Sequence, residues 1–191
     1  MHYKQSHWLL VFILLLLFGI SWSVTRETGR VALQYDYLQL QQGAYWRLMT
    51  AHFTHTTLYH LMMNSLGLIL IAVIFRTSAI IYLLLMLGSL LTINLGLWLN
   101  QQIWYVGFSG VLHGLIAGLI YLDPMPKLIR YTALCLLTVK LIHEQTTEQV
   151  YQPLLASMIA VDAHLYGVIG GLLSAAAIAL AHHLIHFKDR Q

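Results

Sequence analysis

The stretch from Thr77 to Leu122 contains no Asp, Glu, Lys or Arg, and this absence of charge constrains the fold more than any other feature. The whole chain is 59% hydrophobic and 9% charged, whereas charged residues make up about 25% of an average soluble domain. The sequence therefore predicts an integral membrane protein. Strands of a membrane barrel alternate polar and apolar residues, and these runs do not alternate, so we expect helices.

Six apolar runs predict six transmembrane helices in one all-α domain that covers residues 1–191. We expect the spans at residues 8–24, 58–75, 79–99, 109–122, 128–143 and 163–187. The first run is similar to a secretory signal peptide, but the later spans favour a retained helix. Six spans place both termini on one side of the membrane, and the distribution of Lys and Arg slightly favours the cytoplasm.

Two polar segments are expected on the outer side. Residues 25–57 are rich in Tyr and Trp, which concentrate at membrane interfaces, so they predict a long first loop in the outer interface. Residues 144–162 predict a second outer loop. The net charge of +3 is small and spread along the chain, so nucleic acid is not an expected partner. The single Cys135 excludes an intrachain disulfide.

A lone serine between glycines, in Gly107-Phe108-Ser109-Gly110, stands where a polar turn enters the fourth apolar run. A hydroxyl at a helix start lies among free backbone N–H groups, a place suited to an oxyanion. From Ser109 to Leu122 a helix rises about 21 Å, less than the hydrocarbon core of about 30 Å. We therefore expect Ser109 at the floor of an aqueous pocket sunk into the membrane.

His164 is the candidate base for this serine, because it opens the sixth run at the same outer end. Histidines at helix ends are often only interfacial, so the pairing depends on helix packing. Small residues let membrane helices approach closely, and two glycine stripes would bring the fourth and sixth runs together: Gly110, Gly114 and Gly118, and Gly167 and Gly171. A neutral imidazole there can take the serine proton.

His60 and Asn64 stand four residues apart at the start of the second run and share a helix face. Both can donate hydrogen bonds, as an oxyanion hole requires. A polar packing contact between helices is the simpler alternative. Asn is a poor zinc ligand, and His143-Glu144 lacks the second histidine of a His-Glu-x-x-His site. We expect no metal and no cofactor.

These residues together resemble the rhomboid intramembrane serine proteases, from Trp8 to Phe187. The matching motifs, in the order of the family, are Tyr45-Trp46-Arg47, His55-x4-His60-x3-Asn64, Gly107-x-Ser109-Gly110 and Ala163-His164-x2-Gly167-x3-Gly171. The resemblance implies a six-helix rhomboid bundle and a catalytic dyad of Ser109 and His164 that lacks an acid. It implies an oxyanion hole made by the Ser109 backbone N–H and the side chains of His60 and Asn64.

The resemblance also assigns supporting roles. His55 and Arg47 would organise the first outer loop, while residues 144–162 and the fifth span would form the lid and gate for substrate helices. The remaining histidines near the end of the sixth run receive no function: His182, His183 and His186.

His113 departs from the rhomboid pattern, in which an aromatic residue commonly follows the serine by four positions. It either packs beneath His164, as an aromatic would, or uses a ring N–H to orient His164 or a water, partly replacing the absent acid. We favour the second reading slightly. Leu112-His113-Gly114, in a chain expected to have six spans and no cytosolic domain, is similar to the rhombosortase subgroup. Such enzymes process proteins with a C-terminal Gly-Gly motif, a hydrophobic helix and a basic tail.

The resemblance implies a bacterial inner-membrane enzyme with cytoplasmic termini, an active site open to the periplasm, and partners that are transmembrane proteins and membrane lipid. A general bacterial rhomboid protease with other single-span substrates is one alternative. A non-catalytic rhomboid relative that binds clients is another, and retention of Ser109 and His164 argues against it. A small transporter usually has two related halves, and the sequence has no such symmetry.

Overall fold

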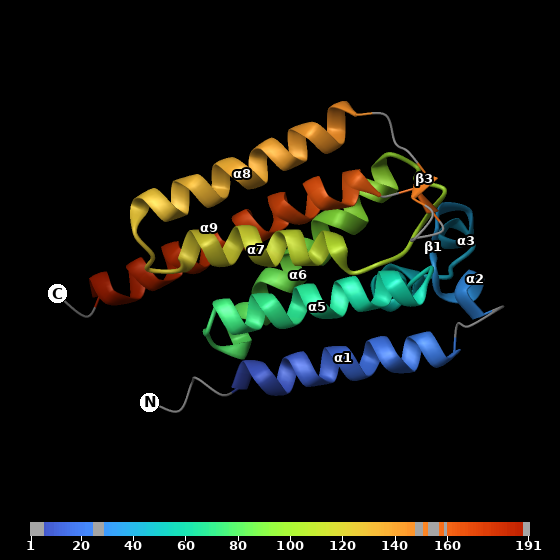
Figure 1. The fold of residues 1–191 in the computed structure, drawn as a ribbon, viewed down its shortest axis with the longest axis horizontal. Coiled ribbons are helices and arrows are strands. Elements are labelled where there is room, and N and C mark those ends of the chain that lie inside the picture. Colours follow the sequence, from blue (N-terminus) through green and yellow to red (C-terminus); the bar gives the residue numbers. More distant parts are fainter. Residues whose placement is uncertain (1–5, 25–28, 148–150, 153–156, 159, 189–191) are drawn as a thin grey trace.

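The structure is a computed structural model that describes residues 6–24, 29–147, 151–152, 157–158 and 160–188. Each apolar run of the sequence forms one long helix, with bounds within a few residues of those expected. These helices are α1 (Ser6–Val24), α5 (Leu58–Ile74), α6 (Ala79–Leu99), α7 (Ser109–Leu122), α8 (Lys127–Thr146) and α9 (Val161–Lys188). Figure 1 shows them side by side as a bundle.

Polar residues and prolines set the helix ends. Thr57 caps α5, because its hydroxyl accepts a hydrogen bond from the His60 backbone N–H at 3.1 Å. Ser78 caps α6 in the same way. Proline cannot continue a helix, and α7 stops at Leu122, two residues before Pro124. The following helix α8 begins directly after Pro126.

The segment after α1 folds into short elements at one end of the bundle: α2 (Gly29–Leu33), β1 (Tyr35–Asp36), α3 (Tyr37–Gln41) and α4 (Arg47–Phe53). β1 pairs antiparallel with β2 (Trp104–Tyr105), so this first loop is joined to the turn before Ser109. A second small ladder pairs β3 (Tyr151–Gln152) with β4 (Ser157–Met158). The sequence did not predict these ladders.

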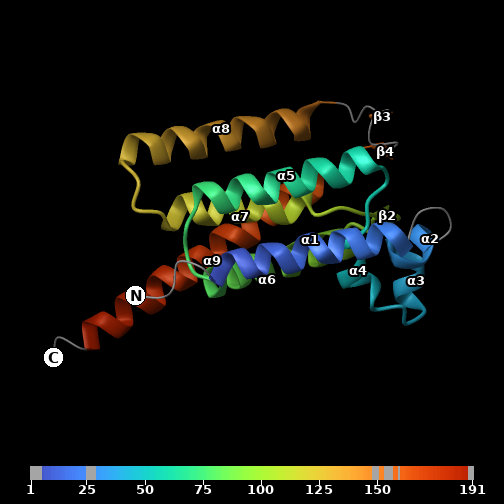
Figure 2. The same ribbon diagram turned by 60° about the horizontal axis from the view of Figure 1, so that its bottom comes forward.

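The start of α1 and the end of α9 lie at the opposite end of the bundle from these short elements (Figures 1 and 2). Among the described residues, three helices are long and apolar enough to cross a membrane, namely α1, α6 and α9. Helices α4 and α5 meet at 89° and add a fourth span if they are counted as one broken span. The expected count of six spans is therefore not established by helix length and apolarity. α7 is short, and the charged residues of α8 lower its hydropathy.

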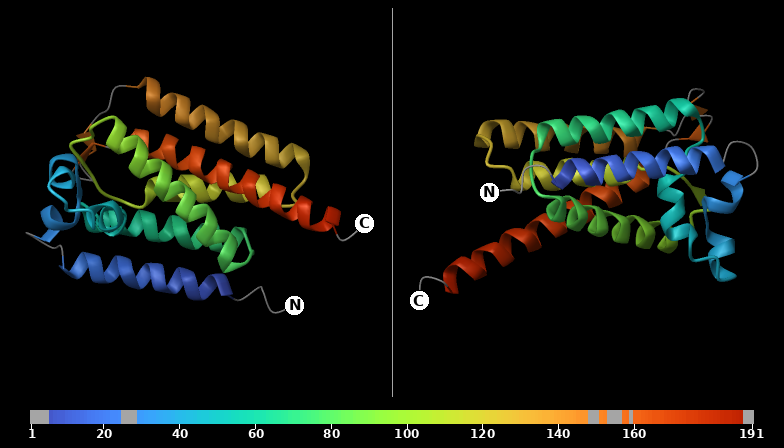
Figure 3. Two further views of the ribbon diagram at one scale, coloured as in Figure 1. Left: turned by 180° about the vertical axis from the view of Figure 1, so that it is seen from behind. Right: turned by 90° about the horizontal axis from the view of Figure 1, so that it is seen from below.

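Helix α7 occupies the middle of the bundle, in contact with α5, α6, α8 and α9 (Figure 3). Buried side chains of α1, including Phe18, join the same core as Phe108 and Leu115. In contrast, Leu141 is the one buried residue of α8, which lies along the edge of the bundle. The central helix is thus held on all sides, and α8 is held weakly.

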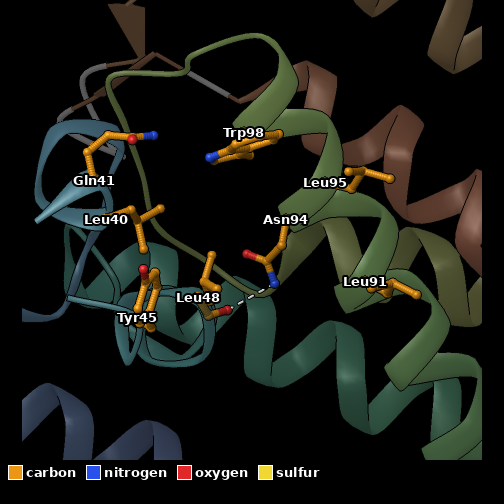
Figure 4. Close-up of a pocket in the computed structure, with 8 residues that line it drawn as sticks. All are labelled: Leu40, Gln41, Tyr45, Leu48, Leu91, Asn94, Leu95 and Trp98. Atoms are coloured by element: carbon orange, nitrogen blue, oxygen red, sulfur yellow. Dashed lines mark hydrogen bonds between the residues drawn. The ribbon is translucent and has the colours of Figure 1, made fainter. Parts of the chain in front are cut away.

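A cavity of about 440 Å³ opens between the first loop and α6 (Figure 4). Asn94 lies beside it and donates a hydrogen bond to the carbonyl oxygen of Leu48 at 3.0 Å. None of the residues expected at the serine site lines this cavity, whose walls are Leu40, Gln41, Tyr45, Leu48, Leu91, Asn94, Leu95 and Trp98.

Candidate active site

The first residue of α7 and a residue in the first turn of α9 form the centre of the candidate site. Ser109 Oγ lies 2.9 Å from His164 Nε2, a hydrogen-bonding distance. His164 is buried with 5% of its surface exposed, and Ser109 is half-buried. The sequence suggested this pair from the position of both residues at helix ends and from the two glycine stripes, and the structure places the two side chains in contact.

Close packing of α7 against α9 aligns the pair. A Cβ atom on Gly110 would lie 2.6 Å from the carbonyl oxygen of Ala163. A Cβ atom on Gly171 would collide with the carbonyl oxygen of Gly114. Gly118 likewise faces the carbonyl of Gly171 across the helix pair. Glycine permits this approach because it has no side chain. The two stripes expected from the sequence therefore meet, with Gly167 against the carbonyl of Gly110.

The other ring nitrogen of His164 has an acidic partner. His164 Nδ1 lies 3.0 Å from Glu144 Oε2, and the second carboxylate oxygen accepts a hydrogen bond from Lys140, one turn earlier in α8. The expected dyad without an acid is therefore wrong as a description of the contacts around His164. The error has a local cause, because α8 continues to Thr146 and Glu144 is helical rather than the first residue of a loop.

Glu144 lies beyond the apolar part of α8, near its C-terminal end. Burial alone would raise the pKa of Glu144, but hydrogen bonds from His164 and Lys140 outweigh it and lower the pKa to about 2. A carboxylate accepts hydrogen bonds and cannot donate them, so His164 Nδ1 carries the proton in this contact. His164 Nε2 then has a free lone pair that can accept the Ser109 hydroxyl proton.

His113 lies directly against the candidate base, His164. Its ring is stacked on that of His164, with centroids 4.0 Å apart and planes 18° apart. Its Nδ1 is 2.7 Å from the carbonyl oxygen of Ser109, which can only accept, so the ring N–H is donated there. His113 thus contacts His164 through its face. This geometry favours the packing role over the hydrogen-bonding role that we expected slightly more.

His60 and Asn64 face the backbone just before the serine. A Cβ on Gly107 would lie 2.8 Å from His60 Nε2 and 3.8 Å from Asn64 Nδ2, and the positive φ of 115° at Gly107 also favours glycine. Asn64 Nδ2 is buried and has no hydrogen-bond partner among the described residues. A buried donor without a partner is rare and calls for an explanation. It lies where an oxyanion beside Ser109 could accept from it.

His55 and Arg47 lie farther from the serine. His55 is buried and contacts His60 edge-on, with centroids 5.0 Å apart, and it also contacts Phe18 of α1. Arg47 Nη1 donates to the carbonyl oxygens of Val31 and Gln34 at 2.7 and 2.8 Å. Arg47 therefore ties α4 to the preceding turn of the first loop, whereas His55 supports the His60 ring.

Sequence reasoning missed three contributors to the geometry. The sequence analysis places Glu144 in the second outer loop and assigns Lys140 no role. Their spacing of four, which suits an ion pair on a helix, was the available signal. Tyr105 donates its hydroxyl to the Gly107 carbonyl, which anchors the turn before Ser109. That contact depends on the pairing of β2 with β1, and no local sequence motif predicts this pairing.

Within the described residues, His113, Glu144 and His164 form a group whose potential metal-ligand atoms all lie within 4.8 Å of one another. Two histidines and a glutamate can bind zinc. Here both ring nitrogens of His164 face hydrogen-bonding partners, and the stacked rings do not direct their lone pairs to one point. The arrangement suits proton transfer better than metal binding.

Residues 42–181 match the family model described as Rhomboid domain, which is well over half of the chain. The matched region contains every residue of the candidate site. No curated protein sequence matches the chain in a similar comparison.

Proposed function

Because this chain belongs to the rhomboid family, we propose that it is an intramembrane serine endopeptidase that cleaves transmembrane-anchored proteins. The observation that carries the proposal is the 2.9 Å contact between Ser109 Oγ and His164 Nε2. A serine and a histidine in this geometry are the parts that acyl transfer requires.

In the proposed reaction, Ser109 Oγ attacks the carbonyl carbon of the scissile peptide while its proton passes to His164 Nε2. The resulting oxyanion accepts hydrogen bonds from the Ser109 backbone N–H and from the side chains of His60 and Asn64. His164 then returns the proton to the leaving amine, and an acyl-enzyme remains on Ser109. Attack by water, with its proton taken by His164, releases the new carboxyl terminus and restores the serine.

The proposal places the enzyme in the bacterial inner membrane, with six spans, cytoplasmic termini and a site that opens toward the periplasm. The start of α9 lies near the short elements of the first loop at one end of the bundle, and His164 in its first turn contacts Ser109. This arrangement supports a single catalytic face. The start of α1 and the end of α9 lie at the other end, as an even number of crossings requires.

The finer proposal is that the substrates are exported proteins with a C-terminal Gly-Gly motif, a hydrophobic helix and a basic tail. It rests on the similarity of Leu112-His113-Gly114 to the rhombosortase subgroup. The histidine at this position is in contact with the base. The alternative is a general rhomboid protease with other single-span substrates.

Co-expression with two membrane-anchored reporters tests the proposal. One carries a Gly-Gly tail of this kind, and the other is a single-span protein without it. We expect a product of lower mass from the Gly-Gly reporter alone, and none with the Ser109→Ala variant. Cleavage of both reporters would favour the general protease. A wild-type protein that cleaves neither and does not react with a fluorophosphonate would support the non-catalytic alternative.

A further inference from the structure

We propose that Glu144 is a positioning residue that completes the site: it holds His164 in the tautomer and orientation that let Nε2 take the serine proton. Because α8 carries Glu144, the complete arrangement forms only while α8 packs against α9. This inference rests on the proposed function and concerns the regulation of the same site.

Three consecutive contacts carry the argument. Lys140 donates to Glu144 Oε1, Glu144 Oε2 lies 3.0 Å from His164 Nδ1, and His164 Nε2 lies 2.9 Å from Ser109 Oγ. An imidazole has one proton in its neutral form, and the carboxylate fixes that proton on Nδ1. The nitrogen that faces the serine is then the one that can accept. Without the carboxylate, the opposite tautomer would direct an N–H at Ser109 Oγ and block proton transfer.

The Glu144–His164 contact differs from an ordinary surface ion pair. The side chains of His164 and Glu144 are 6% and 16% exposed, whereas exposed pairs contribute little because water screens them. Both carboxylate oxygens have partners, since Lys140 binds the one that His164 leaves. The carboxylate therefore has little freedom to rotate away from Nδ1.

The attachment of α8 determines whether this contact forms. Leu141, the one buried residue of α8, lies one turn before Glu144. It packs in a small cluster with Ala117 of α7 and Val168 of α9. This cluster is separate from the main core, so α8 is joined to the bundle near the site through a few side chains. Any movement that withdraws Leu141 also withdraws Glu144 from His164.

Each side of the His164 ring has a different neighbour. Glu144 lies at its Nδ1 edge, Ser109 at its Nε2 edge and His113 against its face, while Lys140 binds Glu144. Removal of the carboxylate allows the tautomer that carries its proton on Nε2, and this should lower the maximal rate.

The rate of labelling of Ser109 by a fluorophosphonate, measured against pH on the full chain in detergent, tests the positioning role without a known substrate. We expect Glu144→Gln to lower the plateau rate by about 10²- to 10⁴-fold, as for loss of a triad carboxylate. Glu144→Asp, which keeps the charge, should recover part of the rate. Asp162→Asn is the matched control, because Asp162 lies in the first turn of α9 and has no hydrogen bond to His164 in the described structure.

A double-mutant cycle tests the dependence on α8. Leu141→Ala should slow labelling by about three- to tenfold in the wild-type background, within the range of couplings between residues in one network. In the Glu144→Gln background it should have no further effect, because the contact it loosens is already gone. Leu136→Ala is the control, since Leu136 lies on the same helix with 65% of its surface exposed.

The outcomes separate the two proposals. Wild-type protein that is not labelled at Ser109 would contradict the proposed function and this inference together. Labelled wild type with an equal rate and pH profile in Glu144→Gln would overturn the inference alone. Equal loss from Leu141→Ala in both backgrounds would overturn the link to α8. If Glu144→Gln also lowers the melting temperature in detergent, the Glu144→Asp variant decides. Recovery of part of the rate without recovery of the melting temperature supports the positioning role, and no recovery of the rate overturns it.

Discussion

The ring of His113 is stacked on the ring of His164, with centroids 4.0 Å apart and planes 18° apart. The two residues lie on different helices, α7 and α9, so the stack joins these helices beside the proposed catalytic base. The ring N–H of His113 is donated to the Ser109 carbonyl. The group that contacts His164 Nδ1 is the carboxylate of Glu144, not His113.

We therefore expect His113→Phe to retain cleavage within about tenfold of the wild type, since a single neutral hydrogen bond contributes about 1 kcal/mol. The phenyl ring keeps the stack and loses only the bond to the Ser109 carbonyl. His113→Ala should be slower than His113→Phe because it removes the support beneath the base. The measurement is cleavage rate against pH on one membrane-embedded substrate. A loss of two decades or more in His113→Phe would restore the hydrogen-bonding role for His113.

Asn64→Ala should slow cleavage by about 10²- to 10³-fold without abolishing it, as loss of one oxyanion donor does. Its Nδ2 is buried without a partner among the described residues, so removing it should not lower the melting temperature. Asn94→Ala is a useful contrast, because Asn94 hydrogen-bonds the Leu48 carbonyl away from the serine. We expect that variant to lose stability and keep its rate. An Asn64→Ala variant that keeps its rate and loses stability would remove Asn64 from the proposed oxyanion hole.

Gly171→Leu should lower both the activity and the melting temperature in detergent. Any Cβ at this position collides with the Gly114 carbonyl, so α9 must move away from α7 and carry His164 with it. Gly19→Leu is the matched control, since a Cβ on Gly19 meets nothing within 4 Å. Full activity of Gly171→Leu would show that this contact does not align Ser109 with His164.

Much of the fold follows from local sequence. The helix bounds follow from the apolar runs and from the capping residues and prolines beside them. This is because a membrane helix satisfies its backbone hydrogen-bonding groups internally. Thr57, Ser78 and Pro124 act on the residues next to them, so their effect can be read from the chain. The number of membrane crossings is harder to read, because the short α7 and the charged α8 depend on their neighbours for a place in the bundle.

The candidate site shows the same division. Ser109 and His164 could be paired from the glycine stripes, because such stripes indicate where two helices pack together. Glu144 could not be paired with His164 in this way, because no motif indicates how α8 lies against α9. The polar residues after Ile142 suggested a loop, whereas α8 continues for one more turn.

Removal of divalent metal should leave the enzyme active. His113, Glu144 and His164 could in principle bind an ion, but a site that works by proton transfer needs the hydrogen bonds of His164 intact. We expect EDTA to leave the cleavage rate unchanged and added Zn²⁺ to inhibit by competing for His164. A rate that EDTA abolishes and Zn²⁺ restores would indicate a metalloenzyme.

The most direct test of the serine mechanism is the mass of the protein after reaction with a fluorophosphonate, followed by identification of the modified peptide. The account predicts one adduct on Ser109 in the wild type, none in Ser109→Ala, and loss of labelling in His164→Ala with the fold retained. Its physical basis is that the Ser109 hydroxyl becomes nucleophilic only when His164 takes its proton. Labelling of His164→Ala at the wild-type rate, or an adduct on another residue, would contradict the account.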